Sequence, residues 1–228
     1  MAHILLIRFF GSLYSGSKKV HDFGACLLSY KTGGPDSREC IFLSRDAKLD
    51  GSKAVRGGIP LVFPQFGHPD KSMPQHGFLR TNFWKADESS AYDNEDGAGI
   101  SYKLQLKDVK NSRGGVWGDD TEYDCSFSYN IKIGAKTITT CLEITNTGNK
   151  SFQFQTLLHT YYHVGGNDAL DGSKCYVKGL EGTSEYLVCS KWAIVVVKRT
   201  ATLSLSLNPS SKIVLDLCRL FSGRQSIW

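Results

Sequence analysis

The dominant pattern along the chain is an alternation of apolar and polar residues with a period of two. It runs without a break from Glu122 to Ile133. The apolar positions there are Tyr123, Cys125, Phe127, Tyr129, Ile131 and Ile133. Residues 102–107 and 138–144 repeat the pattern. Because successive side chains of a strand point to opposite faces, these stretches predict strands with one buried face and one solvent face.

Turn residues separate the alternating stretches. Gly134-Ala135 and the segment 146–149, which contains Gly148, each stand between two of them. No stretch combines a helix cap with a period of 3.6 residues. Repeated long strands with glycine and asparagine turns predict an all-β fold, an antiparallel β-sandwich. At 228 residues the chain has the length of one large all-β domain, so we expect a single domain over residues 1–228.

The segment 56–80 interrupts the strand pattern. It holds four of the six prolines, namely Pro60, Pro64, Pro69 and Pro74. Proline cannot donate to a sheet ladder, so we expect a structured loop here. Long loops on a rigid sheet often carry binding groups, which makes this segment a candidate site.

Composition describes a globular chain, with 41% hydrophobic and 21% charged residues. The net charge of +5 is spread along the chain, which suits an anionic small molecule better than nucleic acid. The seven cysteines form no CxxC pair, and no apolar run is long enough to cross a membrane. These features predict reduced thiols and a cytoplasmic protein with no membrane partner. The sequence also lacks the GxGxxG, GxxxxGK[ST], GxSxG and HExxH motifs. It therefore gives no support for a nucleotide site, a serine nucleophile or a metal site.

His159 is the first candidate for chemistry. Period two in the segment 152–159 puts it on the face opposite Phe152 and Phe154, with Tyr161 of the same parity. An imidazole there can exchange a proton near neutral pH. The alternative is a hydrogen-bonded structural histidine, and the pattern alone does not choose between the two.

The arginines at the two ends of the loop are candidates for binding an anion. Arg56 precedes Gly57-Gly58, which would allow a ligand to approach the backbone closely, and Arg80 closes the segment. A guanidinium can bind two oxygens of a phosphate at once. Gln75 and His76 could contact sugar hydroxyls or could merely hold the loop together. Each arginine could equally be a surface residue that pairs with a nearby acid.

Four segments together resemble the glucose-6-phosphate 1-epimerases, or hexose-6-phosphate mutarotases, of the aldose 1-epimerase superfamily. Residues 50–67, DGSKAVRGGIPLVFPQFG, match that family's hallmark nearly residue for residue. Pro74-Gln75-His76-Gly77 with Arg80, the segment LHTYY at 158–162, and GLEG at 179–182 follow in the family's order. The resemblance covers roughly residues 20–190.

The resemblance implies a galactose mutarotase-like β-supersandwich and an isomerase of carbohydrate metabolism that interconverts the α and β anomers of a hexose 6-phosphate. By analogy, His159 is the acid that acts on the ring oxygen. Arg56 and Arg80 hold the phosphate or neighbouring oxygens, and Gln75 and His76 bind sugar hydroxyls. The family requires no metal or organic cofactor, and we expect a monomer whose partner is the small-molecule substrate.

The resemblance ends near residue 190. In the family the base is a glutamate on a late strand, and no residue of the divergent tail 191–228 matches it. After His159 the acidic residues are Asp168, Asp171, Glu181, Glu185 and Asp216. Lys198-Arg199-Thr200 occupy the region of an expected acidic sugar-binding position. Two hypotheses follow: an epimerase that lacks late strands and has an impaired site, or a non-catalytic sugar-phosphate-binding or regulatory homologue.

Overall fold

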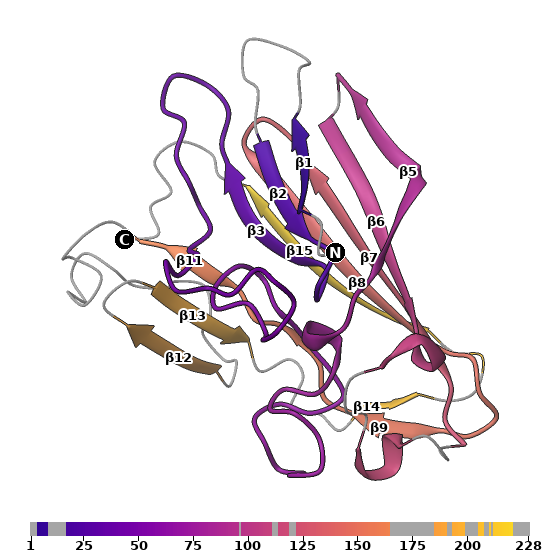
Figure 1. Cartoon of the computed structure of the whole chain (residues 1–228). Helices are drawn as coiled ribbons and strands as arrows, with labels where there is room; N and C mark the ends of the chain where they lie inside the picture. The colour runs from indigo at the N-terminus through magenta and orange to yellow at the C-terminus, as the bar shows by residue number, and fades with distance from the viewer. Residues whose placement is uncertain are drawn as a thin grey trace.

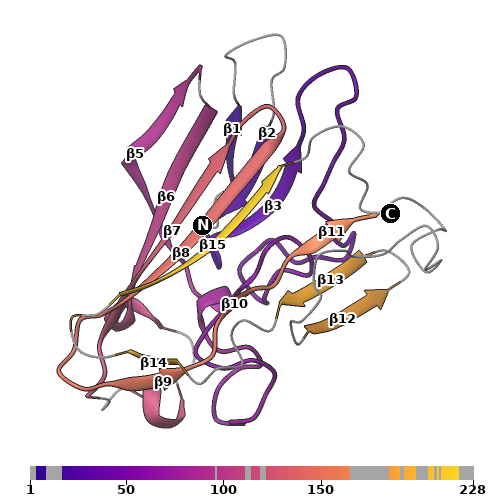
Figure 2. The same cartoon turned by 180° about the vertical axis from the view of Figure 1, so that it is seen from behind.

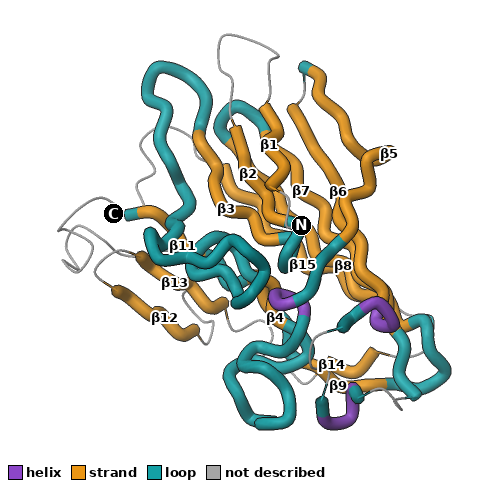
Figure 3. The backbone as a smooth tube through the Cα atoms, in the orientation of Figure 1, coloured by secondary structure: helices purple, strands orange, loops and turns teal. Residues whose placement is uncertain are grey.

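The computed structural model describes residues 4–8, 17–95, 97–110, 114–118, 122–164, 185–190, 193–198, 205–207, 210 and 212–220. Strands dominate this part of the chain (Figures 1 and 3). The strands are β1 (Ile4–Arg8), β2 (Ser17–His21), β3 (Cys26–Lys31), β4 (Leu61–Val62), β5 (Lys85–Asn94), β6 (Gly97–Gln105), β7 (Cys125–Ile133), β8 (Thr137–Asn146), β9 (Phe152–Phe154), β10 (Leu157–Leu158), β11 (Tyr161–His163), β12 (Glu185–Ser190), β13 (Ala193–Lys198), β14 (Leu205–Leu207) and β15 (Lys212–Leu220). Their pairings are antiparallel, so the predicted all-β antiparallel fold is confirmed.

The largest sheet has five strands in the order β15-β8-β7-β6-β5. Strand β7 occupies most of the predicted alternating stretch, and its odd-numbered residues are buried while its even-numbered ones are half-buried or exposed. Strand β8 alternates in the same way, with buried Ile138, Thr140, Leu142 and Ile144. A turn at Gly134 joins the two strands, with the Gly134 N–H donating to the Thr137 carbonyl at 2.9 Å. Period two therefore predicted both the strands and the faces that they bury.

A second layer, formed by β1, β2 and β3, packs against this sheet. It lies in front of the five-stranded sheet in Figure 1 and behind it in Figure 2, the view from the other side. One core joins the two layers, since Leu27 and Tyr30 of β3 belong to the same buried cluster as Tyr102, Tyr129 and Leu142 of the large sheet. Two packed sheets around a shared core are the sandwich that the pattern predicted.

The described residues also form three small sheets, with strand orders β10-β4, β11-β13-β12 and β14-β9. In Figure 1 the sheet β11-β13-β12 lies beside the sandwich and β14-β9 lies below it. In the described ranges the helices are three single-turn 3-10 helices, η1 (Leu79–Thr81), η2 (Leu106–Asp108) and η3 (Gly115–Trp117). No helix within those ranges has the length and apolar character needed to cross a membrane.

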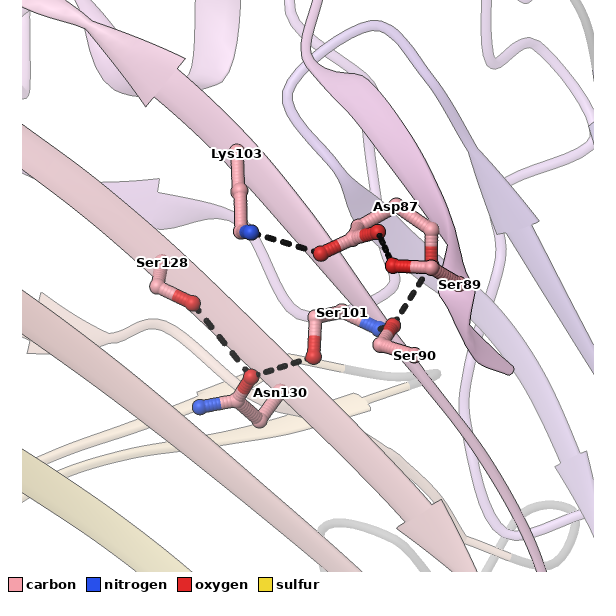
Figure 4. A network of polar contacts seen from close by, with 7 residues as sticks. All are labelled: Asp87, Ser89, Ser90, Ser101, Lys103, Ser128 and Asn130. Atoms are coloured by element: carbon pink, nitrogen blue, oxygen red, sulfur yellow. Dashed lines mark hydrogen bonds and ion pairs between the residues drawn. The ribbon is translucent and has the colours of Figure 1, made fainter. Parts of the chain in front are cut away.

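The solvent face of the large sheet carries a polar network (Figure 4). The Lys103 ammonium pairs with Asp87 at 2.6 Å, and Ser101 Oγ donates to Asn130 Oδ1 at 2.6 Å. Ser128 donates to the same Asn130 oxygen at 3.3 Å. These contacts join β5, β6 and β7 on the face that period two assigns to water, and an exposed ion pair of this kind contributes little to stability.

The proline-rich segment 56–80 is a structured loop, as predicted, and Phe63 anchors it to the core. Its ring is fully buried. Five aromatic rings surround it at centroid distances of 5.0–6.4 Å, those of Phe78, Trp117, Phe127, Phe152 and Phe154. The backbone of the loop is thereby fixed to the sandwich, and its polar residues are held in place.

Candidate functional site

The loop and the His159 segment, almost 100 residues apart in sequence, lie edge to edge. The His159 N–H donates to the Pro60 carbonyl at 3.0 Å, and the Tyr161 N–H donates to Gly58 at 2.9 Å. Strand β10, which lies between Gln155 and His159 in the sequence, pairs with β4 of the loop. The Gln155 amide oxygen accepts from the Phe66 N–H at 2.9 Å. This pairing brings the loop residues next to His159.

Gly57 and Gly58 let the start of the loop pack closely against the backbone at Phe42 and Leu27. Both have positive φ, and a Cβ at Gly57 would lie 2.5 Å from the Phe42 carbonyl oxygen. A Cβ at Gly58 would lie 2.6 Å from the Leu27 oxygen. The space that a side chain would need is filled by the protein's own backbone, so these positions require glycine for the fold itself.

His159 and His76 meet across this junction. Their ring centroids lie 5.4 Å apart at an interplanar angle of 64°. The Nδ1 atom of His159 is buried and has no hydrogen-bond partner among the described residues. His76 is buried in a left-handed backbone conformation with φ of 67°, and its N–H donates to the Gly67 carbonyl at 2.7 Å. The two histidines predicted from sequence therefore form one cluster, and one of them has an unsatisfied ring nitrogen.

Arg80 joins this cluster from η1. One of its terminal nitrogens, Nη2, donates to the Gln75 carbonyl oxygen at 2.7 Å. The Nε atom is buried with no partner in the described part of the chain. Arg80 is thus half-buried and hydrogen-bonded to backbone. It is therefore not a surface arginine paired with an acid, which was the alternative. Gln75 contributes its carbonyl oxygen to Arg80, and its side chain is exposed.

Tyr161 is a site residue that the sequence analysis did not select. Its ring stacks on His159 at a centroid distance of 5.0 Å and an angle of 30°. Burial raises the pKa of its phenol, while the cations of Arg80 and Arg56 act in the opposite direction. Tyr161 therefore lies within electrostatic reach of both arginines. The sequence did hold a signal for Tyr161, because it lies two residues after His159 and so on the same face of an extended chain. Arg56 itself is exposed.

Both histidines are held in their neutral form. Burial, reinforced by the cation of Arg80 and by His159, lowers the pKa of His76 to about 4. Burial is also the main cause that lowers the pKa of His159, and Arg80 lowers it further. Burial likewise lowers the pKa of the Arg80 guanidinium. The site is therefore a set of neutral rings around a cation, and it suits a ligand rich in oxygen that brings negative charge.

The acidic residues after His159 divide into two groups. Glu185 begins β12, which pairs with β13, and Asp216 lies in β15, where it is the register partner of Cys141 in the large sheet. Asp168, Asp171 and Glu181, together with the segment 179–182, lie outside the described residues. Within the described ranges, no three His, Cys, Asp or Glu side chains gather closely enough to hold a metal ion.

The family model of aldose 1-epimerase matches residues 15–209, which is most of the chain. The chain belongs to the aldose 1-epimerase family. The match includes the loop, the His159 segment and the strands that pair them. The resemblance read from the four motifs is thereby confirmed at the level of the family.

Individual relatives agree with this membership. The chain is 30% identical over 175 residues to a candidate glucose-6-phosphate 1-epimerase of Cenchrus ciliaris, covering 74% of this chain and 48% of that protein. A protein of the same description from Escherichia coli strain K12 is 31% identical over 159 residues, covering 69% and 47%. The chain thus spans about half the length of these curated relatives.

A solved structure supports the fold. A candidate mutarotase from Salmonella typhimurium superimposes with a TM-score of 0.61 at 22% identity, covering 92% of this chain and 65% of that one. At this identity the likeness shows the galactose mutarotase-like fold and does not show the chemistry.

Proposed function

We propose that the protein interconverts the α and β anomers of a hexose 6-phosphate. Family membership supports this activity. The observation that carries it is the pair of buried, unsatisfied nitrogens, His159 Nδ1 and Arg80 Nε, in one cluster. A buried polar atom without a partner costs free energy, so a site that keeps two of them indicates a ligand whose oxygens complete their hydrogen bonds.

The two arginines bind different parts of the substrate. Arg56 is exposed, and a guanidinium in that position can bind two phosphate oxygens at once. Arg80 is half-buried beside His159 and already bonds Gln75, so one unsatisfied Nε–H is left for a sugar oxygen. The phosphate therefore lies toward solvent, and the reacting end of the sugar lies toward the histidines.

His159 supplies the proton for ring opening. The ring oxygen takes this proton as the bond from C1 to the ring oxygen breaks, and the electron pair of that bond stays on the ring oxygen. The C1 hydroxyl gives its proton to solvent water and becomes the carbonyl of the open-chain aldehyde. Rotation about C1–C2 and reversal of these steps close the ring on the other face. The lowered pKa of His159 makes its protonated form a stronger acid but a smaller fraction of the protein at neutral pH, so the transfer proceeds through the minor, protonated form of a mostly neutral ring.

Removal of the C1 hydroxyl proton decides between two functions. The family resemblance assigns this step to a late glutamate, and the chain has no residue that matches it. A positioned base contributes about 10²–10⁴-fold to a rate, so its loss leaves a slower epimerase. The second candidate is a sugar-phosphate-binding homologue without turnover, which the same absence favours.

NMR exchange spectroscopy on glucose 6-phosphate separates the two. Our proposal predicts anomer exchange faster than in buffer alone, and predicts that His159→Ala reduces it while substrate binding persists. Arg56→Ala, which removes the exposed guanidinium, should weaken binding of glucose 6-phosphate much more than binding of glucose. Binding with no added exchange would support the second function, and absence of both binding and exchange would contradict both.

A further inference from the structure

We propose that Gln155 is a positioning residue for the two site histidines. It holds the loop segment 66–67 against the strand segment 152–159, and this keeps His76 in contact with His159. The placement stands on the geometry alone. Its effect on turnover rests on the proposed function.

Gln155 bonds the loop twice. Its backbone N–H donates to the Pro64 carbonyl at 2.7 Å, and its side-chain Oε1 accepts from the Phe66 N–H at 2.9 Å. A backbone N–H can only donate, so the oxygen end of the amide must face Phe66. The ladder between β10 and β4 has only two residue pairs and ends at Val62. The two bonds from Gln155 therefore extend the contact beyond that ladder, onto residues that belong to no strand.

Phe66 and Gly67 in turn hold His76. The Gly67 N–H donates to His76 Nδ1 at 3.0 Å, and the Gly67 carbonyl accepts from the His76 N–H at 2.7 Å. The ring centroids of Phe66 and His76 lie 5.0 Å apart at an angle of 39°. Because the His76 ring lies 5.4 Å from that of His159, these contacts form a closed circuit that begins at Gln155 and returns to its own segment.

This circuit lies outside the core that anchors the loop. Phe63 is fully buried in that core, whereas Gln155, Phe66 and Gly67 are all half-buried. Among the described residues, Gln155 is the partner of the Phe66 N–H. Its loss should therefore open the segment locally while the core stays folded, since local openings cost less than global unfolding.

Amide hydrogen exchange in the full chain, followed by NMR without substrate, tests the placement. Gln155→Met keeps the length of the side chain and loses the acceptor, whereas Gln155→Glu keeps an acceptor. Gln153→Met is the matched control, because Gln153 lies in the same segment and its side chain is exposed. In Gln155→Met we expect the amides of Phe66, Gly67 and His76 to exchange about fivefold faster or more, the effect of one lost hydrogen bond. Gln155→Glu and Gln153→Met should keep the wild-type rates.

Three results would overturn the proposal. Unchanged rates in Gln155→Met would show that the bond holds nothing in place. Faster exchange at Phe66 alone would show that its effect does not reach His76. An equal rise in Gln153→Met would show general loosening of the segment. None of these outcomes depends on whether the chain turns over sugar.

Anomer exchange of glucose 6-phosphate tests the consequence for turnover. A displacement of about 1 Å can lower a rate by about 10²-fold. At saturating substrate, and at a temperature where every variant is folded, we expect Gln155→Met to lose about tenfold or more of the added rate. Gln155→Glu and Gln153→Met should stay close to the wild type. A wild-type rate in Gln155→Met would contradict the positioning role. If the wild type itself adds no exchange, the proposed function fails, and hydrogen exchange alone decides the placement.

Discussion

Replacement of Phe63 by alanine should destabilise the protein and loosen the site together. Phe63 is fully buried among five aromatic rings, and truncation of a buried phenylalanine costs about 3–5 kcal/mol. Because domains are stable by only about 5–15 kcal/mol, the loss is a large fraction of the total. In a chain of this length the midpoint of thermal unfolding should fall by roughly 6–20 °C. The carbonyl of Phe63 also accepts from the Phe78 N–H at 2.9 Å, so the segment that carries His76 is disturbed as well.

The assay is urea unfolding followed by far-ultraviolet circular dichroism, with glucose 6-phosphate binding measured in parallel. Phe83→Ala is the matched control, because that ring is 47% exposed. It should cost about 1 kcal/mol or less. If Phe63→Ala cost no more than Phe83→Ala, or weakened the fold with binding affinity unchanged, the loop would not be anchored to the core as described.

Three further predictions test the loop and its electrostatics. Gly77→Ala should cost several times more stability than Gly67→Ala in urea unfolding, because both glycines have φ of 73° but only a Cβ at Gly77 collides, at 1.9 Å from the Phe63 carbonyl oxygen. Equal costs would contradict this geometry. Because the pKa of His76 is depressed to about 4 in the folded chain and lies near 6.5 in the unfolded one, its neutral form contributes stability above about pH 6.5 that is lost as pH falls toward 4. Denaturation at a series of pH values should show this decline, and His76→Gln should flatten it; an unchanged slope would refute the assignment. Arg80→Met removes a cation that lowers the pKa of both site histidines, so NMR titration should show both values rise, whereas a fall in either would contradict the arrangement.

Local periodicity predicted the parts of the fold whose cause is local. Strands β7 and β8 follow from alternation, and the irregular loop follows from its prolines, since a proline removes a ladder donor whatever surrounds it. Strand β15 was missed because the consecutive apolar residues 213–215 break the period of two. Such a short apolar run is ambiguous between strand and helix until its neighbours are known.

The sequence named candidate residues for the site but not their arrangement. The motifs brought forward His159, His76, Arg56 and Arg80, but sequence spacing carries no information on a pairing between segments almost 100 residues apart. The close contacts of Gly57 with Phe42 and of Gly58 with Leu27, and the stacking of Tyr161 on His159, likewise depend on tertiary packing. So does the unsatisfied Nδ1 of His159, which is the strongest indication of a ligand.

The proposed activity is tested by anomer exchange of glucose 6-phosphate at neutral pH, measured by NMR for the wild type and for His159→Ala. We expect exchange above the rate in buffer for the wild type, and a loss of about 10²-fold or more of that added rate in the variant. Exchange at the buffer rate in the wild type, or full activity in His159→Ala, would contradict it.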